Sequence, residues 1–304
     1  MKQKDVCAGI VTYEPDIGRL RENIDAVIGQ VREIYVVDNG SKNRKEIEGL
    51  LKDYDGISLI RNKRNEGIAK ALNQIIGEAD RRGYRRVITL DQDSVCCEGL
   101  IEKYLKYEED DIGILICDIE DRNYKLRKKR TGTHSAKTAL AKTGTLPAKT
   151  ETGSANNDLE WEEVEKCITS GAFTSVKACI EAGGFDEKLF IDSVDYDMCY
   201  SMREHGYRIV NIHFTGLLHE VGKSVKYNIL GYEFAVNHHS AERKYYISRN
   251  STYLIKKHHL APLPEYTLIF RRIFTVLFFE RDKRSKIKAI MTGVRDGWKM
   301  QKTM

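Results

Sequence analysis

Short apolar runs alternate with stretches of helical pattern over the first part of the chain. The apolar runs are rich in β-branched residues and have the length of buried strands. They lie at Val6–Thr12, Glu33–Val37, Gly56–Ile60, Arg86–Leu90 and Ile112–Cys117. Between them, the segments that open at Pro15 and at Gly67 repeat apolar residues at helical spacing. Strands that alternate with helices predict an α/β fold, with a mostly parallel sheet flanked by helices.

The pattern changes twice further along the chain. Residues 121–157 are rich in Lys, Thr, Ala, Gly and Ser, so they bury too little apolar surface to order firmly. We expect a mobile loop here, either a tolerated insertion or an acceptor-side loop that orders on binding. Strand and helix patterns resume from Glu165 to Ile212, and a helical, aromatic pattern then runs to the end. We therefore expect an α/β domain over residues 1–225 and a basic helical extension over residues 226–304.

Charge separates these two parts of the chain. The net charge of the 304 residues is +5, which is too small to indicate a nucleic-acid-binding protein. Residues 241–304 alone contain 15 Lys and Arg against 5 Asp and Glu, a net charge of +10. Such asymmetry suggests that the C-terminal end meets an anionic partner.

The cysteines and the N-terminal residues bear on the cellular compartment. The seven cysteines form no CxxC pair, which argues against a zinc site or a disulfide framework. The first residues lack the long apolar core of a signal peptide. We expect a reducing, cytoplasmic compartment.

Polar clusters follow three of the predicted strands. They are Thr12, Tyr13 and Glu14 after the first, Asp38, Asn39 and Gly40 after the second, and Asp91, Gln92 and Asp93 after the fourth. In open α/β sheets, ligands bind beyond the carboxyl ends of the strands. The three clusters therefore predict a nucleotide site along one edge of the sheet.

Asp91 and Asp93 are the candidate metal-binding pair. They lie two residues apart at a strand end, so their side chains point to the same side. Two converging carboxylates repel each other unless a cation lies between them, and Mg²⁺ or Mn²⁺ bridged to phosphates is the usual solution. Taken alone, the same pattern also fits an Asx-rich turn.

Seven motifs in a fixed order carry a resemblance to a known family. They are VTYE, VVDNGS, RNEGIAKALN, LDQDS, TSGAF, GGFDEKLFIDSVDYDMCYSMREHGY and HEVG. This order resembles the family 2 inverting glycosyltransferases of the GT-A fold, and in particular their bacterial rhamnosyltransferase-like members. The resemblance runs from about Val6 to His219 and continues more weakly through YYISRN at Tyr245–Asn250. It implies a Rossmann-like GT-A domain with a C-terminal helical extension, and transfer of a sugar from a nucleotide-sugar to a hydroxyl.

The resemblance also implies roles for individual residues. The nucleotide-binding residues would be Thr12, Tyr13 and Glu14 at the base and ribose, Asp38 at the pyrimidine N3–H, Asn65 and Gly67 beside the nucleotide, and Asp91 on the ribose side. Asp93 would bind Mn²⁺ or Mg²⁺, with His219 as a further ligand. Ser170, Gly171 and Asp192 would lie near the donor sugar and the acceptor. Without the resemblance, a lone histidine such as His219 is more often structural.

Asp195 is the candidate catalytic base. The family usually has Glu-Asp at this point, before a helix that ends in Gly-Tyr, and here the aligned pair is Val194-Asp195. The rhamnosyltransferase-like members also tend to have Val-Asp. Asp192 and Asp197 remain alternatives, and Asp192 would equally serve as a helix cap. A positioned carboxylate can take the proton of the acceptor hydroxyl, and a metal can stabilise the departing diphosphate. Attack from the face opposite the leaving group inverts the anomeric centre.

The C-terminal segment 265–290 mixes arginine and lysine with aromatic and aliphatic residues. No apolar stretch of the chain approaches the roughly 20 residues that a membrane-spanning helix needs. The segment could lie on the anionic inner face of the cell membrane, or it could be a core helix followed by a solvated basic helix.

The donor sugar and the class of protein leave alternatives. The resemblance points to dTDP-L-rhamnose, with a UDP-hexose as the alternative donor, and to a cell-surface polysaccharide or its lipid-linked precursor as acceptor. A nucleotidyltransferase should have a glycine-rich, basic loop after the first strand, whereas here that loop is Thr12–Pro15. A non-enzymatic module that binds nucleotide or an anionic surface would tolerate replacement of Asp195.

Overall fold

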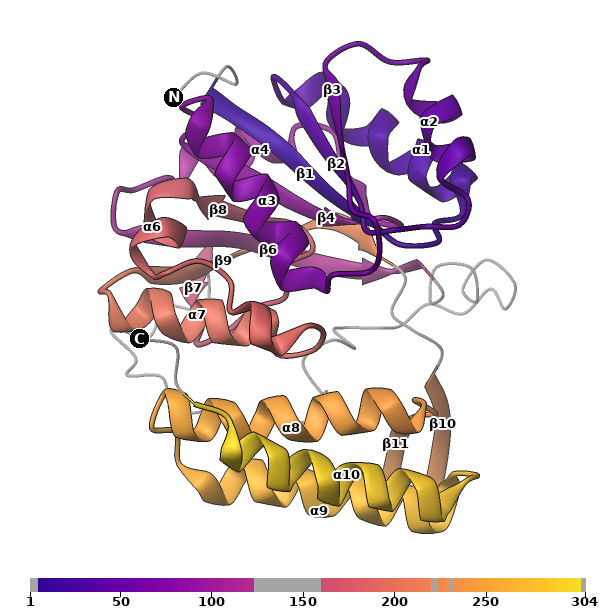
Figure 1. Cartoon of the computed structure of the whole chain (residues 1–304). Coiled ribbons are helices and arrows are strands. Elements are labelled where there is room, and N and C mark those ends of the chain that lie inside the picture. The colour runs from indigo at the N-terminus through magenta and orange to yellow at the C-terminus, as the bar shows by residue number, and fades with distance from the viewer. Residues whose placement is uncertain (1–4, 123–159, 220–223, 230–231, 302–304) are drawn as a thin grey trace.

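The computed structural model describes residues 5–122, 160–219, 224–229 and 232–301 (Figure 1). The first four strands form a parallel sheet in the order β3-β2-β1-β4. They are β1 (Val6–Thr12), β2 (Ile34–Asp38), β3 (Ile57–Arg61) and β4 (Arg86–Asp91). The first four strands predicted from the sequence are thus confirmed, and their ends agree with the prediction within one or two residues.

Beyond β4 the sheet becomes mixed. The further strands are β5 (Val95–Cys96), β6 (Ile112–Asp121), β7 (Trp161–Glu163), β8 (Ala172–Ser175) and β9 (Arg208–His219). Strand β8 runs antiparallel between β4 and β6, whereas β9 runs parallel to β6 and pairs with β5 and β7 at its other edge. Among the described residues this makes one sheet of nine strands.

Helices cover both faces of the sheet, and each face has its own apolar core. Alternating residues of β1 show the division, since Ala8 packs with α1, α2 and α4 while Cys7 packs with α3, α6 and α7. These helices are α1 (Ile17–Val27), α2 (Arg44–Leu51), α3 (Ile68–Arg81), α4 (Leu100–Lys106), α6 (Val176–Glu181) and α7 (Val194–Glu204). A short 3-10 turn (Glu187–Leu189) precedes α7.

The C-terminal extension begins differently from the sequence prediction. We expected a helical pattern from residue 226, but β10 (Ser224–Ile229) and β11 (Tyr232–Asn237) pair as two antiparallel strands. The prediction was wrong here because β-branched and aromatic residues at alternating positions were taken for a helix. Helices follow from Ala241 onward, as α8 (Ala241–Lys257), α9 (Pro262–Phe279) and α10 (Lys283–Lys299).

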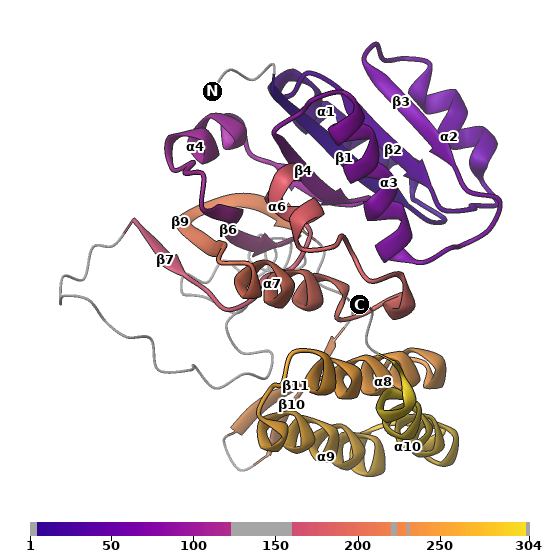
Figure 2. The ribbon, with the colours of Figure 1, turned by 60° about the vertical axis from the view of Figure 1, so that its left-hand side comes forward.

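The three C-terminal helices form a group beside α7 (Figures 1 and 2). Helices α8 and α10 approach closely at two glycines, because a Cβ on Gly293 would lie 2.4 Å from the Tyr245 carbonyl oxygen and one on Gly297 would lie 2.3 Å from that of Arg249. The buried Glu280 carboxylate lies 2.7 Å from the ammonium of Lys244 and 2.8 Å from that of Lys286. These contacts fix α8 against its two neighbours.

Two expectations fall on parts of the chain that are not described. The predicted mobile loop over 121–157 lies outside the described residues, apart from Asp121 and Arg122, and so does Glu220–Gly222. Within the described part of the chain, no helix combines the length and the apolar character needed to cross a bilayer.

Candidate active site

The carboxyl ends of three neighbouring strands bring the predicted nucleotide residues to one edge of the sheet. Thr12 at the end of β1 is in register with Asp38 at the end of β2, and Val11 is in register with Asp91 at the end of β4. Parallel strands end together, so the polar residues that follow them share this edge. The edge contains every residue that the sequence assigns to the first two strand loops.

The loops after β1 and β2 are hydrogen-bonded to each other. The Glu14 N–H donates to the Ser41 hydroxyl (2.9 Å), and the Lys42 N–H donates to the Glu14 carboxylate (3.1 Å). The Tyr13 N–H donates to the Gln92 side-chain oxygen (2.9 Å), so the middle residue of the Asp-Gln-Asp segment fixes a loop. The Tyr13 ring is 47% exposed and therefore available to a ligand.

Asp38 lies deeper than its predicted role suggests. Its carboxylate has no exposed surface, accepts from the Ser41 N–H (2.9 Å) and pairs with the Arg44 guanidinium (2.9 Å). Arg44 is held in turn by the carbonyl of Asn62 (2.8 Å). The carboxylate is thus already paired and has no exposed surface to offer a pyrimidine N3–H. Direct pairing of Asp38 with the base remains a prediction, and its observed contacts stabilise the loop.

Asn65 and Gly67 form a tight turn before α3. The Asn65 side-chain oxygen accepts from the side chain of Asn39 and from the Gly67 N–H (both 3.0 Å). Gly67 has a φ of +89°, and a Cβ there would lie 2.7 Å from the Phe190 carbonyl oxygen. Only glycine fits this position. The turn is thus pressed against the segment that leads into α7.

Asp91, Asp93 and His219 converge from distant parts of the chain. The His219 Nδ1 lies 3.5 Å from the Asp93 Oδ1, and its Nε2 lies 3.8 Å from the Asp91 Oδ2. Strand β9 brings the histidine there, because it continues through His219 and pairs Leu218 with Val95 of β5. Burial raises the pKa of Asp91, His219 lowers it, and the like charge of Asp93 raises it again.

Two serines brace this cluster. The Ser94 hydroxyl lies 3.1 Å from the His219 Nδ1 and 2.6 Å from the Ser170 hydroxyl, which accepts from the Asp91 N–H (3.3 Å). Ser170 is 2% exposed, so its observed role is to fix the strand end. The neighbouring Gly171 has a φ of +80°, and its carbonyl accepts from the buried Tyr104 hydroxyl (2.8 Å). The predicted contacts of both residues with the donor sugar remain predictions.

The donor set suits a divalent cation that is shared with phosphates. Two carboxylates and an imidazole face one another. Carboxylates suit both Mg²⁺ and Mn²⁺, and an imidazole is tolerated better by Mn²⁺ than by Mg²⁺. No group of three His, Cys, Asp or Glu side chains in the described part of the chain is arranged to hold a metal unaided. In enzymes that use Mg²⁺, substrate phosphates commonly supply ligands beside one or two carboxylates.

Asp195 lies in the first turn of α7 and lines a small recess. The other walls of this recess include Cys167, Thr169, Phe185 and Met198. Burial raises the pKa of Asp195 to about 7, hydrogen bonds from backbone N–H groups lower it, and the charges of Asp192 and Asp91 raise it further. A carboxyl group with this pKa exchanges protons readily at neutral pH, as a general base must.

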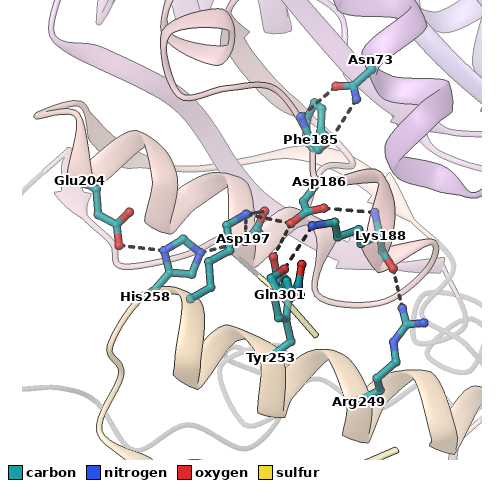
Figure 3. Close-up of polar contacts among 11 residues, drawn as sticks. Asn73, Phe185, Asp186, Lys188, Asp197, Glu204, Arg249, Tyr253, His258 and Gln301 are labelled. Carbon is teal, nitrogen blue, oxygen red and sulfur yellow. Dashed lines mark hydrogen bonds and ion pairs between the residues drawn. The ribbon is translucent and has the colours of Figure 1, made fainter. Parts of the chain in front are cut away.

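The two alternatives to Asp195 are both engaged in structural contacts. The buried Asp197 carboxylate accepts from the Lys257 ammonium at 2.8 Å. It also contacts the His258 Nε2 (Figure 3), with 2.8 Å between the two atoms. Asp192 pairs with the Arg243 guanidinium (3.1 Å) and has a φ of +64°. Neither carboxylate is as free to accept a proton from a substrate as that of Asp195.

Comparison with known proteins identifies the family. The profile of glycosyl transferase family 2 matches residues 7–171, which is more than half of the chain. The chain belongs to this family. It is 29% identical over 305 residues to the dTDP-rhamnosyl transferase RfbF of Shigella flexneri, and the match covers 96% of each protein.

Solved glycosyltransferases have the same fold. The structure of S. aureus TarS 1-349 matches 95% of this chain and 80% of its own, with a TM-score of 0.57 and 12% identity. GalNAc-T7 with UDP, GalNAc and Mn²⁺ matches 97% of this chain and 56% of its own, with a TM-score of 0.56 and 13% identity. The GT-A fold and the glycosyltransferase activity expected from the sequence are thus confirmed.

Several residues of this family 2 site were missed in the sequence. The buried Asn23 amide donates to the Asp91 carbonyl (2.6 Å), and no local pattern in α1 signals this contact. Ser94 stands next to Asp93 in LDQDS, so its position could have suggested a role. Arg249 and Asn250 end the YYISRN motif and contact the segment before Asp195.

Proposed function

We propose that this glycosyltransferase moves L-rhamnose from dTDP-L-rhamnose to a hydroxyl of a cell-surface polysaccharide or its lipid-linked precursor, with inversion at the anomeric carbon. The observation that carries the proposal is the convergence of Asp91, Asp93 and His219 at the sheet edge, with Asp195 nearby in a recess. The charge of Asp91 influences the pKa of Asp195, so the two parts lie close enough to interact. The similarity to a dTDP-rhamnosyl transferase supports the choice of donor.

The positions of the residues support the following roles. Asp93 and His219 would hold Mn²⁺ or Mg²⁺, which would offset the charge of the departing diphosphate. Asp195 would accept the proton of the acceptor hydroxyl as that oxygen attacks. Thr12, Tyr13 and Glu14 would surround the base and ribose. The partly exposed Tyr13 offers a ring face for stacking.

A donor screen tests the proposal. The purified protein is expected to release nucleotide from dTDP-L-rhamnose faster than from UDP-glucose or UDP-galactose. The reason is that the proposed donor site accommodates a rhamnosyl group better than a glucosyl or galactosyl group. Released dTDP or UDP is measured with Mn²⁺ present, and Asp195→Asn serves as the blank. Faster release from a UDP-hexose would replace rhamnose with the alternative donor. Turnover of no nucleotide-sugar, together with no binding of dTDP or UDP, would count against the proposal as a whole.

We further propose that the extension rests on the inner face of the cell membrane. One face of α9 exposes five large apolar side chains at helical spacing, namely Leu263, Phe270, Phe274, Leu277 and Phe278. Arg271 and Arg281 are exposed beside them, and Lys283 and Arg284 follow. Apolar side chains flanked by cations suit an anionic lipid surface, where each Lys or Arg contributes about 1 kcal/mol.

Vesicle flotation tests this contact. The protein is expected to float with phosphatidylglycerol-containing vesicles and to remain unbound with pure phosphatidylcholine. The double variant Phe274→Glu/Phe278→Glu should lose binding, whereas Ile180→Glu, at an exposed apolar position of α6, should retain it. Flotation of the double variant at the wild-type level would contradict membrane contact. A wild-type dimer that this variant converts to a monomer would instead assign the face to a second copy of the chain.

A further inference from the structure

The segment that leads into α7 has an unusual backbone. Phe190, Asp192 and Ser193 have φ values of +58°, +64° and +64°, a conformation that non-glycine residues rarely adopt. Ser193 is the N-cap of α7, yet its side chain makes no capping hydrogen bond. Such conformations persist only when the surrounding structure fixes them, and they concentrate at functional sites. Asp195 follows two residues later.

One buried side chain of the C-terminal extension holds this segment. The Asn250 amide of α8 donates to the carbonyls of Leu189 (2.9 Å), Ile191 (2.7 Å) and Asp192 (2.7 Å). All three partners are acceptors, so the amide nitrogen must face them. The Asn250 side-chain oxygen accepts from the Arg249 guanidinium (2.8 Å), which fixes the orientation of the amide.

Neighbouring residues of α8 extend this contact. Arg249 donates to the carbonyls of Lys188 (2.7 Å) and Leu189 (3.1 Å), as Figure 3 shows for Lys188. The Phe190 ring stacks on Tyr246 with centroids 5.4 Å apart. At the start of the segment, the Asp186 carboxylate accepts from the Tyr253 hydroxyl (2.9 Å) (Figure 3). Contacts with α8 therefore run from Asp186 to Asp192.

The same segment contacts both halves of the site. The Phe190 carbonyl accepts from the Ile68 N–H (2.7 Å) at the start of α3, beside the Asn65–Gly67 turn. The Ser193 carbonyl accepts from the Asp197 N–H (3.0 Å) and so belongs to the turn of α7 that carries Asp195. A shift of this segment would move the base relative to the nucleotide side.

We infer that Asn250 is a positioning residue, which holds the left-handed turn Phe190–Ser193 from the C-terminal extension and thereby sets the place of Asp195. The inference rests on the proposed function in taking Asp195 as the base and, for the kinetic test, dTDP-L-rhamnose as the donor. It gives the extension a part in catalysis that is separate from membrane contact.

The test compares Asn250→Asp with Lys256→Ala. The aspartate has the same shape as asparagine but places an oxygen against three carbonyl oxygens. Lys256 holds α8 to α10 through the carbonyls of Trp298 (3.2 Å) and Met300 (2.7 Å) and does not contact the turn, so it controls for a loosened extension. Turnover of dTDP-L-rhamnose, read as released dTDP, gives kcat and KM. Hydrogen exchange of the amides of residues 189–197 reports on the turn directly.

Asn250→Asp is expected to lower kcat roughly 10²-fold, as misplacement of a reacting group by about 1 Å does, with KM within about threefold of wild type. Exchange over 189–197 should become faster, and Lys256→Ala should change neither quantity. If Asn250→Asp does not fold, Asn250→Ala replaces it with the same expectations. Unchanged exchange, or faster exchange with unchanged kcat, would overturn the inference. If wild type turns over no nucleotide-sugar, the proposed function fails while exchange still decides whether Asn250 holds the turn.

Discussion

Asp195→Asn is expected to lower kcat for sugar transfer or donor hydrolysis by roughly 10²–10⁴-fold, the usual contribution of a general base. The amide has the shape of the carboxyl group but cannot take a proton at neutral pH. Calorimetric titration with dTDP and Mn²⁺ should show wild-type affinity, because Asp195 lies on the acceptor side of the proposed reaction. Wild-type turnover by this variant would remove Asp195 from the mechanism.

The pH dependence follows from the burial of Asp195. Its pKa in the folded protein is raised to about 7, above the value of about 3.9 for an exposed aspartate. The base works only when ionised, so kcat should rise with pH through about 7 and then level off. The raised pKa also makes the free energy of unfolding depend on pH. Ionising the buried carboxyl group is unfavourable in the folded protein, so its contribution to stability is complete below about pH 4 and is lost as the pH rises through about 7. Asp195→Asn should therefore melt at a higher temperature than wild type at pH 8.

Asp197→Asn and Asp192→Asn separate chemistry from structure. Asp197 is buried between Lys257 and His258, so its replacement should lower the melting temperature while kcat stays near wild type. Asp192 pairs with Arg243 at a partly exposed position, and its loss should have a smaller effect on stability. A collapse of kcat in a folded Asp197 variant would transfer the role of base to that residue.

Local pattern was sufficient to predict the first half of the fold. Strands β1, β2 and β4 are buried apolar runs, and β3 is a half-buried one at the edge of the sheet. The polar residues that follow β1, β2 and β4 meet at one edge because the strands are parallel. The two-residue spacing of Asp91 and Asp93 likewise predicted a shared direction. These features depend only on residues that are close together in the sequence, so the sequence alone is sufficient to predict them.

Three features that depend on distant partners were not predicted. The strand and helix patterns were read only as far as Ile212, but strand β9 continues to His219 because β6 and β5 pair with its second half. The burial of Asp38 against Arg44 depends on the packing of α2 at the end of β2. The contacts of Asn250 with residues 189–192 join the C-terminal extension to the α/β domain, and nothing in YYISRN indicates their partners.

Asp93→Ala is expected to abolish the dependence of nucleotide binding on metal. Asp93 and His219 approach each other within 3.5 Å, and a divalent cation shared with the diphosphate would relieve the repulsion between Asp91, Asp93 and the phosphates. Wild type should bind dTDP more tightly with Mn²⁺ than with EDTA, and the variant should bind equally in both. Its turnover should fall roughly 10²–10³-fold, which corresponds to several kcal/mol of lost charge stabilisation.

Two further variants make this titration decisive. Glu98→Gln removes an equal charge from an exposed position just beyond β5 and should keep the full response to Mn²⁺. His219→Ala should weaken that response, and should do so more with Mn²⁺ than with Mg²⁺, because imidazole nitrogen is a better ligand for manganese. Equal dTDP affinity with and without EDTA in wild type would rule out a metal-dependent reaction. A full Mn²⁺ response in His219→Ala would leave Asp93 and the diphosphate as the metal ligands and reduce His219 to a partner of Ser94.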